Sequence, residues 1–142
     1  MLLPPSNVRV RVTPVSLLDT LAPGCWLEVP DSHLRPLKAP TPPGITEAAC
    51  GNFRHIMGAW NSGAFDTLRN RLLIWGGGHA AYGGNEWYAF DLVTLTWIRL
   101  NDPSAFVGFT QGDRVMPDGT APTAHTYDGL AYLPNVDKVF VG

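Results

Sequence analysis

The chain has 142 residues, of which 45% are hydrophobic and 15% charged, and its formal net charge is −2. This length suits a single domain that buries a substantial core. The ten Lys and Arg residues are scattered rather than gathered into a stripe, which argues against a nucleic-acid-binding surface. No apolar run approaches the roughly 20 residues that a membrane span needs.

Glycine, proline and aromatic residues set the expected fold class. The chain holds 15 Gly, 13 Pro and five Trp, which is typical of short aromatic strands joined by many turns. This composition predicts an all-β fold. The N-terminus, Met1 to Pro5, has no basic region leading into a long apolar stretch, so it does not resemble a signal peptide, and the compartment is left open.

Residues 1–46 are predicted to form an N-terminal segment with few regular elements. Val8 to Val12 alternates Val with Arg, as a short strand would, and Val15 to Leu21 has room for one helical turn at most. Cys25 to Val29 predicts a strand that carries Trp26. The proline-rich stretch 31–46 predicts a connector.

The two cysteines, Cys25 and Cys50, match no metal-site spacing and are too few for a disulfide framework. Each is expected to be a small buried hydrophobic residue. A Cys25–Cys50 disulfide is the alternative.

Residues 47–104 contain a complete unit of four predicted strands. A cluster of three glycines follows the second strand, where it permits backbone angles and close approaches that a Cβ would forbid. Single aspartates at strand ends, such as Asp66 and Asp91, are expected to bond turn backbone. The four strands are Ile56 to Phe65, Leu72 to Trp75, Glu86 to Asp91 and Leu95 to Leu100.

Residues 105–142 begin with a long connector and then repeat the first half of that unit. His125 to Tyr132 matches the first strand, and Lys138 to Val141 matches the second. Trp75 and Val141 occupy equivalent places in this alignment, 66 positions apart. One full unit and a second that stops halfway indicate a repeat architecture.

This pattern resembles the kelch repeat of β-propellers, which has four strands, a glycine cluster after the second strand and a Trp at the start of the fourth. The match rests on Gly76, Gly77 and Gly78, on Trp87-Tyr88 and on Trp97, and it covers about residues 20 to 142. The extended pattern is similar to bacterial kelch and galactose-oxidase-type proteins. The resemblance implies a partial propeller: about one and a half four-stranded blades plus an N-terminal strand, around Trp26, that closes the ring. It also implies that the chain is the N-terminal fragment of a larger protein.

The resemblance also points to candidate ligand contacts. Loops between second and third strands lie near the central channel of a propeller, which makes His79, Tyr82 and Asn85 candidates. His125 and Tyr127, two apart on the expected innermost strand, would face the same way. The competing interpretation, which we favour at both places, is that these residues only bond backbone or pack. Trp60, Trp75, Trp87 and Trp97 are expected to fill the space between blades rather than to form a sugar platform.

The resemblance implies a binding or interaction scaffold whose ligand is a protein or a carbohydrate. The alternative is an oxidase-like or carbohydrate-active enzyme whose catalytic residues lie mostly elsewhere. The sequence contains no nucleophile elbow, P-loop or dinucleotide fingerprint. Neither cysteine lies in the context of the cross-linked cysteine of galactose oxidases, so no copper ligand, other metal or cofactor is predicted. Uncovered blade faces predict self-association of the isolated chain.

Overall fold

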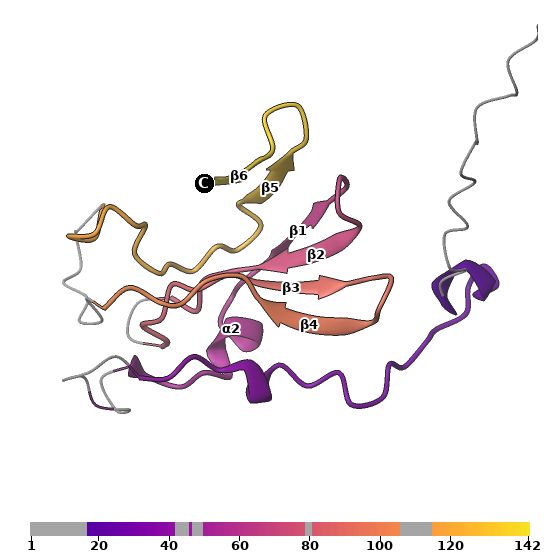
Figure 1. Cartoon of the computed structure of the whole chain (residues 1–142), viewed down its shortest axis with the longest axis horizontal. Coiled ribbons are helices and arrows are strands. Elements are labelled where there is room, and N and C mark those ends of the chain that lie inside the picture. The colour runs from indigo at the N-terminus through magenta and orange to yellow at the C-terminus, as the bar shows by residue number, and fades with distance from the viewer. Residues whose placement is uncertain (1–16, 42–45, 47–49, 79–80, 106–114) are drawn as a thin grey trace, which may run out of the picture.

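A computed structural model of the protein describes residues 17–41, 46, 50–78, 81–105 and 115–142. Most of its regular structure is strand in antiparallel sheets, with little helix, which confirms the predicted all-β class (Figure 1). The 3₁₀ helices Leu17–Thr20 and Arg35–Leu37 and the short helix α2 (His55–Gly58) precede the strands. The strands are β1 (Gly63–Asp66), β2 (Arg71–Ile74), β3 (Tyr88–Asp91), β4 (Thr96–Arg99), β5 (Leu130–Leu133) and β6 (Lys138–Val141).

The first four strands form one antiparallel sheet in the order β1-β2-β3-β4, and aspartates fix two of its turns. Asp66 Oδ1 accepts hydrogen bonds from the backbone N–H groups of Leu68 and Arg69, both at 3.1 Å. Asp91 Oδ1 does the same for Val93 and Thr94, at 2.8 Å. The predicted turn role of these two aspartates is therefore confirmed, because each carboxylate satisfies two N–H groups that the strand ladder leaves unpaired.

The β5–β6 hairpin repeats the β1–β2 hairpin. Both have a four-residue turn whose last residue, Asn70 or Asp137, has a left-handed φ of 52° or 51°. When the two ladders are superposed by register, each residue of the β1–β2 hairpin corresponds to the residue 67 positions later in the β5–β6 hairpin. Gly63, for example, corresponds to Leu130. The spacing of 66 in the sequence alignment is therefore wrong by one residue, because the shared turn, and not the Trp75–Gly76 boundary, sets the correspondence.

The two faces of the β1–β4 sheet differ in the size of their side chains. Residues directly opposite one another in the ladder share a face. One face, which we call the open face, carries a row of large apolar side chains from all four strands: Phe65, Leu72, Phe90 and Trp97. The other, which we call the small face, carries the smaller row of Ala64, Leu73, Ala89 and Ile98.

The β5–β6 hairpin packs on the small face. Ala64 and Trp75 form a buried cluster with Leu130, and the half-buried Trp87, Tyr132 and Val139 pack against it. Trp75 and Trp87 stack with ring centroids 5.5 Å apart, and β5 lies beside β1 (Figure 1). The small side chains of the sheet leave the room that these rings fill.

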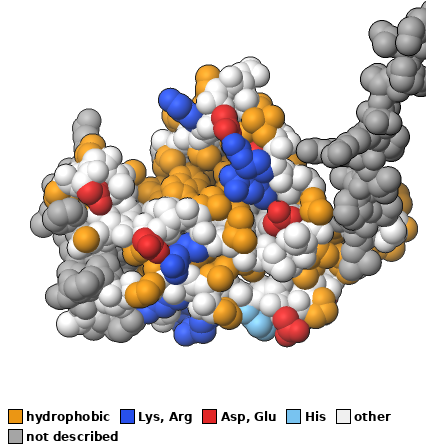
Figure 2. Space-filling view, in the orientation of Figure 1, with side chains coloured by type: hydrophobic (Ala, Val, Ile, Leu, Met, Phe, Trp, Pro, Cys, Tyr) orange, Lys and Arg blue, Asp and Glu red, His pale blue; other side chains and the backbone are white. Residues whose placement is uncertain are grey.

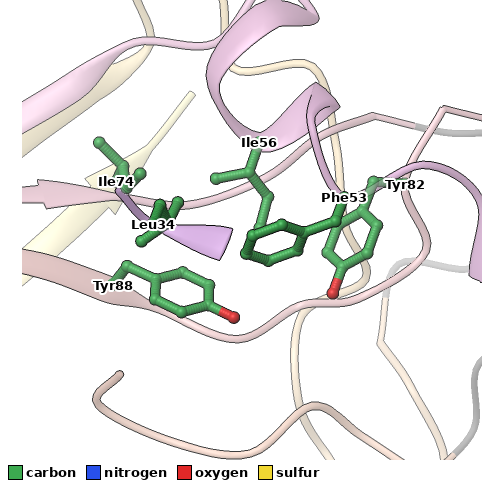
Figure 3. Packing of buried hydrophobic residues seen from close by; sticks show 6 residues of the cluster. All are labelled: Leu34, Phe53, Ile56, Ile74, Tyr82 and Tyr88. Atoms are coloured by element: carbon green, nitrogen blue, oxygen red, sulfur yellow. The ribbon is translucent and has the colours of Figure 1, made fainter. Parts of the chain in front are cut away.

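The N-terminal segment and α2 cover one end of the open face. Leu34, Phe53 and Ile56 bury Ile74 and Tyr88 in a second cluster that also includes Tyr82 (Figure 3). Phe53 contacts Tyr82 and Tyr88 edge-on, at centroid distances of 5.5 and 5.8 Å. The core of the molecule thus lies on both faces of the sheet, at the end where β2 runs into the glycine cluster.

Several predicted strand boundaries are wrong. The first strand begins at Gly63 rather than Ile56, because residues 55–58 form the helical turn α2. The Nδ2 amide of Asn61 donates to the backbone oxygens of His55 and Ile56, which satisfies carbonyls at the end of this turn. The strand predicted from His125 begins only at Leu130, because Tyr127 has a left-handed φ of 48°.

The ring-closing role predicted for the N-terminal strand around Trp26 stays a prediction. Residues 25–29 pair with no described strand, and Trp26 is 97% exposed. An isolated strand has no ladder partner for its backbone groups, so this stretch stays irregular. The predicted strand at Val8 to Val12 lies outside the described residues.

The prediction for the cysteines is confirmed for one residue only. Cys50 is buried, as expected, but Cys25 is exposed. No disulfide joins them in the structure.

Candidate functional site

The glycine cluster lets the segment before β5 cross the end of β2 at close range. Gly76, Gly77 and Gly78 have φ values of 104°, 141° and 79°, which disfavour residues with a Cβ. The N–H of Gly77 donates to the oxygen of Ala124 at 3.3 Å. A Cβ on Gly78 would overlap the imidazole ring of His125. The glycine cluster is therefore needed for the close approach of the segment before β5, and the side chain that lies against it is His125.

One ring nitrogen of His125 lies at hydrogen-bond distance from the backbone. Its Nδ1 lies 2.8 Å from the backbone oxygen of Ala59, and because a carbonyl can only accept, Nδ1 carries the proton. In the neutral ring this leaves the lone pair on Nε2. The ring of Trp60 meets the imidazole at 90° with centroids 5.1 Å apart, and the ring of Tyr127 lies 6.1 Å away.

The two aromatic residues beside His125 are exposed and conformationally strained. Trp60 is 69% exposed and Tyr127 64%, and their φ values are 50° and 48°. A left-handed conformation costs a residue with a Cβ roughly 1–2 kcal/mol. Strain of this kind persists only where the surroundings enforce it, and it concentrates at functional sites. We call Trp60, His125 and Tyr127 the aromatic–histidine surface.

Buried polar contacts beneath the surface enforce this geometry. The N–H of Tyr127 donates to the oxygen of Trp60 at 2.7 Å, which ties the two strained residues together. Thr126, which is 2% exposed, accepts from the N–H of Ser62 through Oγ1 at 3.0 Å. Asn61 Oδ1 accepts from the N–H of Thr126. Two segments more than 60 positions apart are thus locked side by side, with their aromatic rings outward.

Tyr82, one of the predicted site residues, lies in the core. Its hydroxyl donates to Glu86 Oε1 at 2.5 Å, and the hydroxyl of Tyr88 donates to the same oxygen at 2.9 Å. Figure 3 shows the rings of both tyrosines in the cluster with their hydroxyl groups at its margin. Burial, and then the charge of Glu86, raise the pKa of both tyrosines. Within the described part of the chain, Glu86 Oε2 has no hydrogen-bond partner.

Asn85 is also buried, and it ties the connector to the sheet. Its Nδ2 donates to Thr120 Oγ1 and to the oxygen of Ala121, both at 2.9 Å. Its Oδ1 accepts from the N–H of Ser104 at 2.7 Å. The whole amide is bonded to protein groups, so the geometry favours the interpretation that Asn85 bonds backbone. His79 lies outside the described residues.

A second polar cluster joins the β1–β2 hairpin to the β5–β6 hairpin. Arg69 donates to Asp137 through both Nη atoms, at 2.7 and 2.5 Å, and to Asp66 at 3.1 Å. Arg71 Nε donates to Asp66 at 2.8 Å. Basic and acidic side chains lie side by side in this part of the surface (Figure 2). The cluster lines a cleft of about 250 Å³.

The charged side chains of this cluster shift one another's pKa values in the directions expected of stabilising ion pairs. Burial alone would raise the pKa of Asp66, but hydrogen bonds from Arg69 and Arg71 outweigh it, and the pKa lies below its ordinary value. Arg69 and Tyr132 lower the pKa of Asp137. Burial and the bond to Asp137 raise the pKa of Tyr132 to about 12. The charges satisfy one another, so the cluster holds the hairpin on the sheet.

Sequence reasoning selected His125 and Tyr127 but assigned Trp60 to packing. In the structure Trp60 has a left-handed φ and is exposed, so the described residues do not bury it, and its predicted place between blades stays a prediction. An exposed Trp87 or Tyr82 would have favoured a sugar platform, yet Tyr82 is buried and Trp87 half-buried. Nothing in the sequence indicates that Trp60 is exposed beside His125, because a strained backbone at a Trp cannot be seen in composition or spacing.

Comparison of the chain with protein-family models, with curated proteins and with solved structures found no match. No helix in the described ranges is long and apolar enough to cross a membrane. Over the same ranges, no three His, Cys, Asp or Glu side chains lie together in a way that could hold a metal ion.

Proposed function

We propose that this protein is a binding scaffold of the kelch-repeat type, whose aromatic–histidine surface takes a neutral carbohydrate. The observation that carries the proposal is the pairing of exposure with strain at Trp60 and Tyr127. The fold supplies buried partners that hold two large aromatic rings in water, against both the hydrophobic effect and backbone preference.

The chemistry of the surface fits a sugar ring. The apolar C–H face of a pyranose stacks on an aromatic ring, and its hydroxyl groups need hydrogen-bond partners close by. Trp60 offers an aromatic ring, Tyr127 offers a hydroxyl, and the imidazole of His125 lies close to both rings. Rigid aromatic side chains lose little conformational entropy on binding, which favours affinity.

Three features support the kelch-type part of the proposal. The sheet is an antiparallel meander of four strands, its three glycines lie between β2 and β3, and Trp97 lies in β4. A second hairpin then repeats β1–β2 and packs beside it, with β5 next to β1. We interpret the sheet as one blade and the hairpin as the inner half of the next.

Glycan-array binding tests the proposal, with the purified chain probed on neutral oligosaccharides of glucose, galactose, xylose and N-acetylglucosamine. Trp60→Asn and Tyr127→Asn remove the rings while keeping a residue that tolerates a left-handed φ. Each should weaken binding about tenfold or more, as loss of a central aromatic contact does. Leu68→Asn is the matched control, because Leu68 is 60% exposed in the turn at the far end of β1.

Equal binding by all three variants, or no binding of any glycan by the unaltered chain, would overturn the proposal. The alternative function, an oxidase-like or carbohydrate-active enzyme, stays a prediction.

A further inference from the structure

We infer that the open face of the β1–β4 sheet is a docking surface for a second copy of this chain, which binds it through the outer face of its β5–β6 hairpin. The inference does not depend on the proposed carbohydrate ligand. It rests on a packing arrangement that the molecule already contains once.

The open face is an apolar surface only partly covered by the chain itself. Phe65 is 44% exposed and Leu72 37% exposed, and both lie in the same cross-strand row as Phe90 and Trp97. A groove of about 430 Å³ lies over the part of this row formed by Leu72, Phe90 and Trp97. Its lining includes Leu72, Phe90 and Trp97 from the sheet and Leu27, Val29 and Met57 from the N-terminal side. Contiguous exposed apolar surface of this kind marks an interaction site.

The repeat identifies what fits on the open face. By the 67-residue correspondence, Phe65 and Leu72 are equivalent to Tyr132 and Val139 of the hairpin. Tyr132 and Val139 pack against the cluster of Ala64 and Trp75, on the small face of the sheet. An open-face surface thus already packs on a small-face surface inside this molecule.

The complementary surface is also present and uncovered. The outer face of the hairpin carries Ala131 and Phe140, the counterparts of Ala64 and Leu73 on the small face. Phe140 is 56% exposed, whereas Leu73 is 3% exposed under the hairpin. The molecule therefore has an unfilled open face and an unfilled counterpart of the small face.

These two surfaces cannot meet within one molecule. The hairpin packs on the small face, so its outer face points away from the open face on the other side of the sheet. A contact between them must join two copies head to tail, which is a heterologous association and not a two-fold one. Chains or a closed ring would follow.

Sedimentation velocity over a wide concentration range tests the inference on the full chain. Phe65→Glu places a charge on the open face, and Phe140→Glu places a charge on the outer face of the hairpin, so each variant disrupts one of the two contact surfaces. Both side chains are exposed, so each variant should fold, which circular dichroism checks. Val115→Glu, at a residue 60% exposed in the connector, is the control. We expect association of the unaltered chain and the control, and at least a tenfold rise in the dissociation constant for each Phe variant alone.

Mixing the two Phe variants gives the decisive result. Each variant retains the contact surface that the other has lost, so the intact hairpin of Phe65→Glu can bind the intact open face of Phe140→Glu. The mixture should therefore form a dimer that grows no further. A two-fold contact through the open face alone would instead leave Phe140→Glu associating like the unaltered chain, which would overturn the inference. So would a mixture that stays monomeric, or an unaltered chain that is monomeric throughout.

Discussion

Replacing Gly78 by Ala tests whether the glycine cluster exists to let His125 lie against the backbone. At a φ of 79°, an alanine costs about 1 kcal/mol in backbone strain. The added Cβ would also overlap three atoms of the His125 ring, and forcing a packed group aside costs a further ~1–3 kcal/mol. The expected loss in the free energy of unfolding is therefore about 2–4 kcal/mol, measured by urea denaturation.

Two further variants separate the backbone cost from the steric one. Gly119 has a φ of 81° but no atom within 4 Å of an added Cβ, so Gly119→Ala should cost only the backbone part, about 1 kcal/mol. In a His125→Ala background, Gly78→Ala should cost about the same, because the overlapping ring is gone. The reasoning is refuted if Gly78→Ala is no more destabilising than Gly119→Ala.

Three further predictions concern the contacts that hold the sheet and its hairpin. Asp66→Asn should cost about 2 kcal/mol at neutral pH by weakening charged hydrogen bonds. Because the folded state lowers the pKa of Asp66, this difference should be full above pH ~4 and vanish as pH falls through the lowered pKa, which acid-range urea titrations would show. Tyr82→Phe should cost about 1–3 kcal/mol in thermal unfolding, since buried Glu86 loses a donor. Trp75→Ala should cost about 3–5 kcal/mol in urea by opening a cavity beside Trp87. An Asp66→Asn effect that does not change with pH, or a loss below 1 kcal/mol at Tyr82 or Trp75, would contradict these assignments.

Local sequence rules predicted the sheet well. The four strands lie within or beside the predicted ranges because turn aspartates and apolar runs fix them locally, as at Asp66 and Asp91. The first strand is predicted to begin too early because Asn61, inside the predicted range, ends a helical turn by hydrogen bonding through its side chain to backbone oxygens of that turn. Whether the stretch around Trp26 forms a strand cannot be read from local sequence, because a strand depends on a pairing partner and pairing is a long-range property.

The candidate site was only half predictable. His125 and Tyr127 have a spacing that suggested a shared face, and their rings do lie together. Trp60 joins them through a hydrogen bond between backbones more than 60 positions apart, which no local pattern encodes. Tyr82 and Asn85 were sensible candidates from their glycine-flanked loop, but burial and bonding to Glu86 and Ser104 can be seen only in three dimensions.

The central claim is that Trp60 contacts a carbohydrate, and the indole N–H resonances of the five tryptophans report on it most directly. The measurement is a series of ¹H–¹⁵N correlation spectra during titration with neutral glucose, galactose, xylose and N-acetylglucosamine oligosaccharides. Trp60→Asn assigns its resonance by deletion. The account predicts that the Trp60 signal shifts saturably with at least one sugar while that of Trp75, which is 2% exposed, stays in place. A Trp60 signal that no sugar moves would contradict it.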